Sequence, residues 1–444
     1  MTKDLTQGNV TKTMLLFAYP MILGNLLQQC YNIADSFIVG KFLGSGALAA
    51  VGSAYSLMTF ITSVIIGLCM GSGTIFSVWF GRNDKQQLKN NIAVSFLFIA
   101  AFTVIINVLI FAAVDPILHI LNVPPDIYAS MREYVWLIFF GIFFVFLYNY
   151  FAFLLRAIGN SVIPLCFLGA AAVINIVLDI LFVVTFKQGI SGAALATVIA
   201  QAVSGIGLGV YVLFKEPELC PKISEVKISR ETVLAVIRHS SAACVQQSVM
   251  NFGILMIQGL VNSFGTAVMA AFAAAVKIDS FAYMPAQEFG NAFSLFISQN
   301  HGSGKQDRVR EGMHKAVKIS AIFCLIISAL IFILAPYLMQ IFVKANETEI
   351  ISIGTGYLRI EGSFYIGIGI LFLLYGFYRG IEKPEMSLIL TVISLGTRVM
   401  LAYVLSPVPA IGVSGIWWAI PIGWFLADLT GILYLRKSLS FKKS

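Results

Sequence analysis

The sequence predicts an all-α polytopic membrane protein with twelve transmembrane helices in two pseudo-symmetric six-helix halves. Three observations lead to this prediction. Of the 444 residues, 59% are hydrophobic and only 11% are charged, whereas soluble domains carry roughly 25% charged residues. Apolar runs long enough to cross a bilayer recur along the whole chain. The second half of the chain also repeats features of the first at a nearly constant offset.

Turns and charges divide the apolar runs into twelve predicted helices. The longest polar stretch, 215–231, predicts a cytoplasmic linker between an N-terminal lobe over 1–214 and a C-terminal lobe over 232–444. The polar N-terminal residues lead straight into an apolar helix, so we expect no cleavable signal peptide. The predicted helices span 13–40, 47–80, 89–114, 128–155, 161–185, 191–214, 232–263, 267–299, 313–343, 350–378, 385–406 and 411–435.

The distribution of positive charge predicts the orientation. With the N-terminus placed in the cytoplasm, 22 of the 29 Lys and Arg residues lie on the inner side, four lie outside and three lie within helices. Cytoplasmic loops of membrane proteins are enriched in these residues, so both termini are predicted to be cytoplasmic. The net charge of +8 therefore reflects membrane orientation and does not indicate nucleic acid binding. The six Cys residues are scattered without metal-ligand spacing, so we interpret them as packing residues.

The internal repeat predicts how the halves are related. At an offset of 221, Gly44 aligns with Gly265, and at 223, Arg156 aligns with Arg379 and the sequence GISGA aligns with GVSGI. Each half holds an even number of helices, so both halves point the same way across the membrane. We expect a pseudo-two-fold axis along the membrane normal, with the substrate path between the halves.

Asp35 lies in the stretch QQCYNIADSFIVG (28–40), inside an apolar helix long enough to cross the membrane. A carboxylate at the centre of a bilayer costs at least about 2.5–3.5 kcal/mol. Because its charged form loses hydration there, such a group favours binding a proton or a cation. Asp35 is therefore a candidate coupling site for ion-driven transport.

Four further polar residues of the first half are predicted at the depth of Asp35. Asn175 and Asp179 are four apart and share one helix face, while Thr197 and Tyr134 lie on helices that start outside. Counting residues places Asp35, Asp179, Thr197 and Tyr134 about 8–9 Å below the outer surface. Their oxygen atoms suit sodium or a shared proton; alternatively, each side chain forms a hydrogen bond with a neighbouring backbone group.

Most of these residues align with a residue of another type in the second half, which favours a functional role over a structural one. The aligned pairs are Asp35 with Met256, Asn175 with Arg398, Asp179 with Ala402 and Thr197 with Ile420.

The second half carries its own buried charges, including Lys277, Asp279 and Glu361. Glu288 and Glu361 are candidates for attracting a cationic substrate into a central cavity, although an ion pair of Glu361 with Arg398 is an alternative. Gln258 is a further candidate cavity residue. In the first half, Pro20 is predicted to kink its helix and can act as a hinge.

Enzymatic and nucleotide-binding motifs are missing from the sequence. The segment HGSGK (301–305) departs from the phosphate-loop spacing, because Gln299 occupies the position of the first glycine. Neither a zinc-protease motif nor a nucleophile elbow occurs. We therefore expect no enzyme activity, no ATP site and no cofactor apart from a coupling ion.

Several motifs of the sequence resemble those of a known protein family. The stretch AYPMILGNLLQQCYNIADSFIVG, the loop WFGRND, LLRAIGNSVIP, and INIVLDILFV followed by GISGAALATVIAQ resemble the multidrug and toxic compound extrusion (MATE) transporters, most closely their DinF-like bacterial branch. This resemblance implies coupling acids at Asp35 and Asp179, supported by Asn175, Thr197 and Tyr134. It also implies cavity roles for Gln28 and Asn149, and a bend at Pro20. The chain departs from the NorM-like branch, because its seventh helix carries no acid.

Together these features predict a secondary antiporter of the bacterial inner (cytoplasmic) membrane. It would export amphipathic, cationic drugs in exchange for inward H⁺ or Na⁺, by alternating access between two lobes, and a monomer would suffice. Sodium would bind at Asp35, Asn175, Asp179 and Thr197. Two alternatives stay open: a lipid-linked oligosaccharide flippase of the same superfamily, and a membrane-embedded enzyme.

Overall fold

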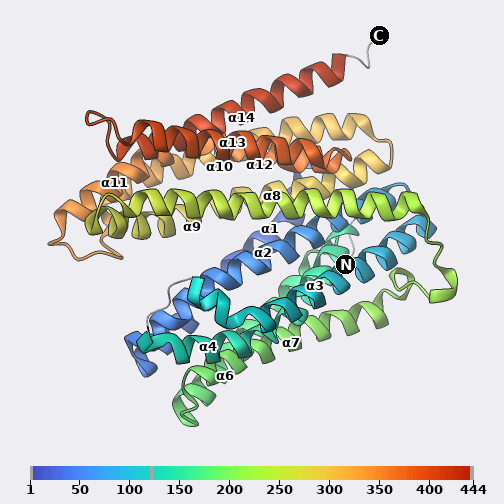
Figure 1. Cartoon of the computed structure of the whole chain (residues 1–444). Helices are drawn as coiled ribbons and strands as arrows, with labels where there is room; N and C mark the ends of the chain where they lie inside the picture. Colours follow the sequence, from blue (N-terminus) through green and yellow to red (C-terminus); the bar gives the residue numbers. More distant parts are fainter. Residues whose placement is uncertain (1–3, 121–124, 441–444) are drawn as a thin grey trace. The chain divides into compact units, whose positions relative to one another are not determined.

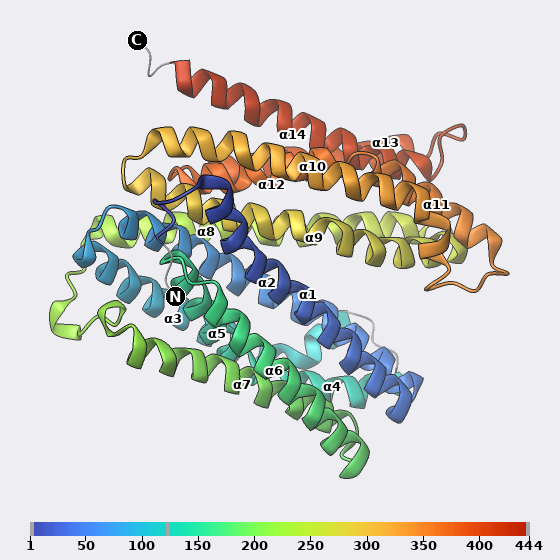
Figure 2. The same cartoon turned by 180° about the vertical axis from the view of Figure 1, so that it is seen from behind.

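The computed structural model describes residues 4–120 and 125–440, and every regular element within these ranges is helical (Figure 1, Figure 2). The chain ends, which are predicted to be cytoplasmic, lie partly outside the described residues. The elements up to the central linker are α1 (Val10–Leu43), α2 (Ser45–Gly81), α3 (Lys85–Ile120), α4 (Pro125–Phe139), α5 (Ile142–Ala157), α6 (Val162–Asp179), the π-helix η1 (Ile180–Thr185) and α7 (Gly189–Lys215). They are followed by two short 3-10 helices, η2 (Pro217–Leu219) and η3 (Ile223–Glu225), and then by α8 (Arg230–Asn262), α9 (Thr266–Gly302), α10 (Gln306–Met339), α11 (Thr348–Gly362), α12 (Tyr365–Gly380), α13 (Pro384–Leu405) and α14 (Ser414–Ser440).

Ten of the described helices are long and apolar enough to cross a membrane, and two bent helix pairs bring the total to as many as twelve spans. The bent pairs are Ile127–Phe139 with Ile142–Ala157, at 42°, and Thr348–Gly362 with Tyr365–Gly380, at 51°. The predicted all-α membrane fold is therefore confirmed. The predictions of unbroken helices over 128–155 and 350–378 are wrong, because each of these spans breaks near its middle.

The first break lies at Phe140 and Gly141, between α4 and α5. There the backbone turns more tightly: the Phe140 and Gly141 amides donate to the carbonyls of Leu137 and Ile138, at 3.2 and 2.9 Å. The Gln201 side chain of α7 fills the space where a Cβ on Gly141 would stand. A larger residue at position 141 would therefore force the Gln201 side chain to move, and glycine leaves room for it.

The second break, at 363–364, lies 223 residues after the first, so it falls at the equivalent position of the internal repeat. Eight of the ten left-handed backbone positions among the described residues are paired in the same way, at offsets of 221 or 223. Such agreement in backbone geometry supports a structural repeat that extends beyond residue type. The pairs, with their φ angles, are Gly44 (86°) and Gly265 (96°), Asn83 (57°) and Gly304 (74°), Gly159 (87°) and Glu382 (61°), and Gly189 (65°) and Gly412 (56°).

The described chain packs into two compact units. The first unit comprises Tyr19–Cys244 with the described part of Met1–Leu5, and the second comprises Thr6–Ala18 with the described part of Val245–Ser444. The start of α1 thus belongs to the second unit, and the start of α8 belongs to the first. The predicted lobes over 1–214 and 232–444 follow the sequence repeat, whereas these units follow packing, so the predicted lobe boundaries stay a prediction.

The first unit buries an aromatic core around Tyr150 of α5, whose ring meets Phe96 of α3 edge-on at 5.2 Å. The start of α8 packs closely on α2 through two glycines. A Cβ on Gly67 would lie 2.6 Å from the Cα of Cys244, and one on Gly71 would overlap the His239 carbonyl oxygen. Small residues four apart let two helix backbones approach closely in this way.

The second unit has a core of stacked aromatic rings, in which Phe272 of α9 lies parallel to Trp417 of α14 at 5.5 Å. Two polar contacts, one from the residue that precedes α10 and one from the first turn of α10, hold the chain before α1 in this unit. The Lys305 ammonium donates to the Thr6 carbonyl at 2.8 Å, and the Arg308 guanidinium donates to the Gly8 carbonyl at 2.7 Å. These contacts account for the inclusion of Thr6–Ala18 in the second unit.

Candidate functional site

Asp35 and Asp179 lie in the first unit, on α1 and α6. Asn175 and Asp179 are buried on one face of α6, as their spacing of four predicts, with 1% and 0% of each residue exposed. Asp179 is the last residue of α6, and the chain continues without interruption into the π-helix η1. Wider turns of this kind occur frequently at functional sites, where they alter the direction of a side chain. The equivalent second-half segment, 403–408, consists of the last residues of α13 and the turn that follows it, so it does not form a π-helix.

The carboxyl groups of Asp35 and Asp179 lie next to each other and interact directly. Three of their oxygen atoms are buried without a hydrogen-bond partner of ordinary geometry among the described residues: Oδ1 of Asp35 and both oxygens of Asp179. Buried acceptors are normally satisfied. The arrangement therefore leaves oxygen atoms available for a proton or a cation.

The other predicted members of the cluster lie around this pair. The Asn175 side-chain amide donates to the Thr197 hydroxyl of α7 at 3.3 Å. The Oδ1 of Asn175 is also buried and has no partner in the described part of the chain. Tyr134 of α4 is 6% exposed, and its hydroxyl group interacts electrostatically with both acids. The structure thus brings all five predicted residues into one region of the first unit.

Sequence reasoning missed one residue of this region, Tyr31. It lies one helical turn before Asp35 on α1, and the charges of both acids act on its hydroxyl. The signal was present in the sequence, because residues four apart share a helix face. Tyr31 and Tyr134 place two phenolic hydroxyl groups beside the paired acids.

Two carboxyl groups in contact, with Asp179 fully buried and Asp35 half-buried, strongly disfavour a state in which both carry an uncompensated charge. One of them must hold a proton, or a cation must lie between them. The oxygen atoms of Asp35, Asn175, Asp179 and Thr197 are hard donors of the kind that suit sodium. Such an arrangement of oxygen atoms has the chemistry needed to hold a proton or a small cation.

The MatE family model matches residues 20–181 and 242–404, which start 222 residues apart and cover both halves of the repeat. The chain belongs to the MatE family. The "Probable multidrug resistance protein YpnP" of Bacillus subtilis (strain 168) is 30% identical over 435 residues, which are 98% of this chain and 96% of that protein.

Two further comparisons agree with membership of the MatE family. The "Probable multidrug resistance protein NorM" of Thermotoga maritima is 24% identical and covers 92% of this chain and 88% of that protein. A solved structure described as an "outward-facing conformation of a multidrug resistance MATE family transporter of the MOP superfamily" superposes with a TM-score of 0.93. It is 24% identical over 99% of this chain and 98% of its own, which shows the shared fold.

The remaining cavity candidates of this MatE-family chain are dispersed. Gln28 is exposed on α1, and Pro20 is buried inside the same helix. Asn149 donates to the Val145 carbonyl of its own helix at 2.8 Å, and Gln258 donates to Asn262 of its own helix at 2.8 Å. These local bonds neither require nor exclude a role in a cavity, so both assignments stay predictions.

Glu288 takes part in a polar network inside the second unit. It accepts a hydrogen bond from the Asn291 side-chain Nδ2 at 3.3 Å, and the Asn291 side-chain Oδ1 accepts one from the buried Arg379 guanidinium at 3.0 Å. The Arg379 charge also interacts with that of Glu288. Glu288 thereby compensates a buried cation of its own unit.

The second unit of this MatE-family chain also holds a buried acidic pair, Asp279 of α9 and Glu361 of α11, each 3% exposed. The Tyr365 hydroxyl donates to Asp279 at 2.6 Å, and the Tyr357 hydroxyl interacts with both acids. The Arg398 charge acts on both acids as well. Its proximity agrees with the structural alternative for Glu361, in which Arg398 compensates its charge.

Both halves of the chain therefore contain a buried acidic pair, at different positions of the repeat. The second half lacks the residue types at the mates of Asp35 and Asp179, yet it builds an acidic cluster at other positions. Asp279 was visible as a charge in an apolar helix, but its partners lie on α11, α12 and α13. Only the packing of these helices shows which residues surround it.

Proposed function

We propose that this chain is a secondary antiporter that exports amphipathic, cationic drugs in exchange for inward H⁺ or Na⁺. The relatives named as multidrug resistance proteins support drug export as the direction and the class of substrate. The observation that carries ion coupling is the pairing of Asp35 with Asp179, whose buried oxygen atoms lack partners in the described chain.

The coupling follows from differential affinity. An ion that binds one facing state more tightly than the other shifts the equilibrium between them. Because α1 carries both Asp35 and Pro20, occupancy of the acid pair can be transmitted along α1 to the proline. Alternating access then results from rocking of the two repeats about the central path.

The proposed location of the protein is the inner (cytoplasmic) membrane of a bacterium, where a proton or sodium gradient is available. A monomer suffices, because the paired acids come from one chain. The proposal includes no enzyme activity, no nucleic acid partner and no cofactor other than the coupling ion.

The test is dye efflux from proteoliposomes with an imposed proton gradient or an imposed sodium gradient, each applied alone. Wild-type protein should export the dye under one of the two gradients. Asp35→Asn and Asp179→Asn should each lower the gradient-driven rate at least tenfold, because an amide neither releases a proton nor neutralises sodium. Asp115→Asn is the matched control, since this acid is half-exposed on α3 and pairs with Arg132 at 2.6 Å.

Gradient-driven efflux that survives in both aspartate variants would refute the coupling role. Wild-type protein that moves a lipid-linked oligosaccharide across the bilayer, and no dye, would favour the flippase alternative. Turnover of a substrate by detergent-solubilised protein, where no gradient exists, would favour a membrane enzyme.

A further inference from the structure

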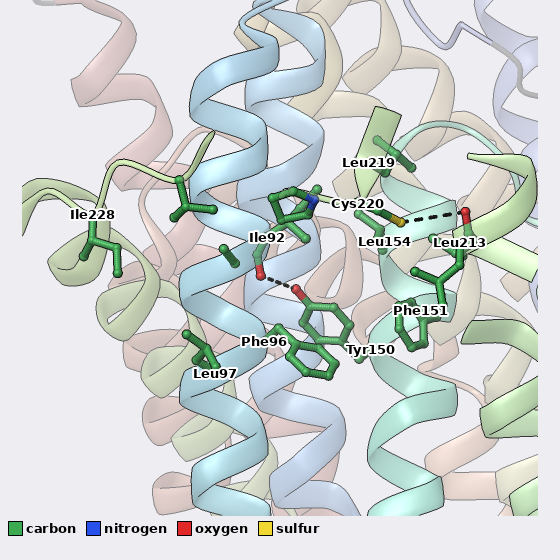
Figure 3. Close-up of a pocket in the computed structure, with 14 residues that line it drawn as sticks. Ile92, Phe96, Leu97, Tyr150, Phe151, Leu154, Leu213, Leu219, Cys220 and Ile228 are labelled. Carbon is green, nitrogen blue, oxygen red and sulfur yellow. Dashed lines mark hydrogen bonds between the residues drawn. The ribbon is translucent and has the colours of Figure 1, made fainter. Parts of the chain in front are cut away.

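An apolar cavity of about 450 Å³ lies in the first unit, beneath the segment that follows α7 (Figure 3). Three helices and this segment enclose it: Ile92, Phe96 and Leu97 come from α3, Phe151 and Leu154 from α5, and Leu213 from α7 (Figure 3). Its size falls in the range of small-molecule sites, about 300–1,000 Å³. It is separate from the Asp35–Asp179 pair, whose residues do not line it.

The Tyr150 hydroxyl and the Cys220 thiol at this cavity already have hydrogen-bond partners within the protein. The Tyr150 hydroxyl donates to the Ile92 carbonyl at 2.7 Å and lies 2.9 Å from the Ser95 hydroxyl. The Cys220 thiol is directed to the Val212 carbonyl at 3.9 Å. What remains for an occupant is aliphatic and aromatic surface, so the matching ligand is a hydrocarbon chain.

The cavity is continuous with surface that faces the bilayer. Leu97 of α3 and Leu213 of α7 line it and are 61% and 57% exposed on helices that qualify as membrane spans. Ile228, which also lines it, is 63% exposed. Large aliphatic side chains exposed on membrane helices contact lipid chains, so a lipid chain can pass from the bilayer into the cavity without crossing polar surface.

The segment over 217–228 covers the cavity because α3 holds it at several points. The ammonium groups of Lys85 and Lys89 contact the carboxylates of Glu218 and Glu225, each at 2.7 Å. The Lys227 backbone amide donates to the Asn90 side chain at 3.0 Å. These bonds place the segment as a roof above Ile92 and Phe96.

Exposed lysines lie on and beside this roof. Lys222 and Lys227 are exposed on the segment, and Lys215 is exposed at the end of α7, whereas Glu218 and Glu225 are already paired with lysines of α3. The charge distribution of the whole chain predicts that the segment faces the cytoplasm. Exposed lysines at a membrane surface attract anionic lipid headgroups. An anionic headgroup at the roof would place its acyl chain at the mouth formed by Leu97 and Leu213.

We propose that this cavity binds one acyl chain of an anionic phospholipid of the cytoplasmic leaflet, with the headgroup held by the lysines of the roof. The proposal rests on the membrane location and predicted orientation of the chain. It is independent of the coupling mechanism and of the substrate. Lipid bound there would fix the roof segment against α3, α5 and α7.

The test uses vesicles that contain phosphatidylglycerol with a photoreactive diazirine near the end of one acyl chain. After irradiation, peptide mass spectrometry should locate the label on residues of 92–97, 151–154 and 213–228. Ala93→Phe, which fills the cavity from α3, should lower this labelling at least fivefold. Val108→Phe is the control, since Val108 is equally exposed on α3 at 61% but does not line the cavity.

The headgroup is tested with phosphatidylcholine that carries the same photoreactive chain. It should label the cavity several-fold less than phosphatidylglycerol, and Lys222→Ala with Lys227→Ala should remove the difference. A second readout uses wild-type protein, so it does not depend on a variant that folds. Alkylation of Cys220 by N-ethylmaleimide, followed by mass spectrometry, should be several-fold slower in phosphatidylglycerol than in phosphatidylcholine vesicles.

Label spread evenly over the exposed surface of α3, or unchanged by Ala93→Phe, would mean ordinary contact with surrounding lipid and would overturn the proposal. Equal alkylation of Cys220 in both lipids would overturn it as well. Loss of the label on addition of the exported dye would assign the cavity to the transported substrate instead.

Discussion

Replacing Gly67 by alanine tests the close packing between α2 and the start of α8. The new Cβ would lie 2.6 Å from the Cα of Cys244 and 2.9 Å from the Ala243 carbonyl oxygen, whereas ordinary contacts begin at 3.4 Å. The helices would have to separate by about 0.8 Å, the difference between 3.4 and 2.6 Å. Because both neighbours are backbone atoms, no side-chain rotation relieves the overlap, and overpacking of this kind costs about 1–3 kcal/mol.

The matched control is Gly52→Ala on the same helix. Gly52 is exposed, and a Cβ there meets no described atom within 4 Å. Both substitutions gain about 1 kcal/mol of helix propensity, so the difference between the variants isolates the overpacking. For a unit of this size, 1 kcal/mol corresponds to about 2–4 °C in Tm.

The assay is thermal unfolding of detergent-solubilised protein, followed by intrinsic fluorescence. Gly67→Ala should unfold roughly 2–12 °C below Gly52→Ala, from the overpacking cost and the conversion to Tm. Equal melting temperatures for the two variants, or a higher one for Gly67→Ala, would show that α8 does not pack on α2 at this distance.

Three further predictions concern buried and surface contacts. The hydroxyl groups of Ser72 and Ser240 lie 2.8 Å apart in the first unit, so a double-mutant cycle with alanine should give a coupling of about 0.5–1.5 kcal/mol; additive changes in the unfolding free energy would contradict the bond. Asp279→Ala leaves the Tyr365 hydroxyl buried without its acceptor, which costs about 1–3 kcal/mol. Asp279→Asn keeps an acceptor and should lower Tm less; an equal decrease of Tm in both variants would refute this reasoning. The Lys89 ammonium holds the pKa of Glu225 in the folded protein below its usual range. The contact is therefore fully present above the pKa of Glu225 in the unfolded chain, about 4.3, and is lost as the pH falls through the lower pKa of the folded state. Protection of residues 217–228 from hydrogen exchange, corrected for intrinsic rates, should fall in that acidic window and stay constant around neutral pH; constant protection down to pH 3 would exclude the role of this contact.

Several features of the fold could be predicted because they depend on local properties. Hydrophobic run length determines which segments can span a bilayer, and ten such helices and two bent pairs occur in the described chain. The breaks at 140–141 and 363–364 were not predicted, because neither contains a proline or a polar run long enough to divide the span. Gly141 accommodates Gln201 of α7, and that neighbour is known only from the packing.

The candidate site was likewise predictable only where it depends on local properties of the sequence. The spacing of Asn175 and Asp179 predicted that they share one face of α6, and counting residues predicted a common depth with Asp35, Thr197 and Tyr134; the structure places these residues in one region, whereas their role stays a prediction. Depth along a helix can be counted, but the direction that a helix face takes toward its neighbours cannot. For this reason the contacts of Asp279 with Tyr365 and with the Arg398 charge emerged only from the structure.

By itself, the sequence determined the number of possible spans, the excess of positive charge on one side, the two-fold repeat and the costly acids within apolar helices. These follow from hydropathy, charge and periodicity, which are properties of neighbouring residues. The tertiary structure decided that Asp35 meets Asp179, that the start of α1 packs in the second unit and the start of α8 in the first, and that the segment after α7 roofs a cavity. These arrangements join residues far apart in the chain, and they depend on which helix surfaces fit together, which no local pattern specifies.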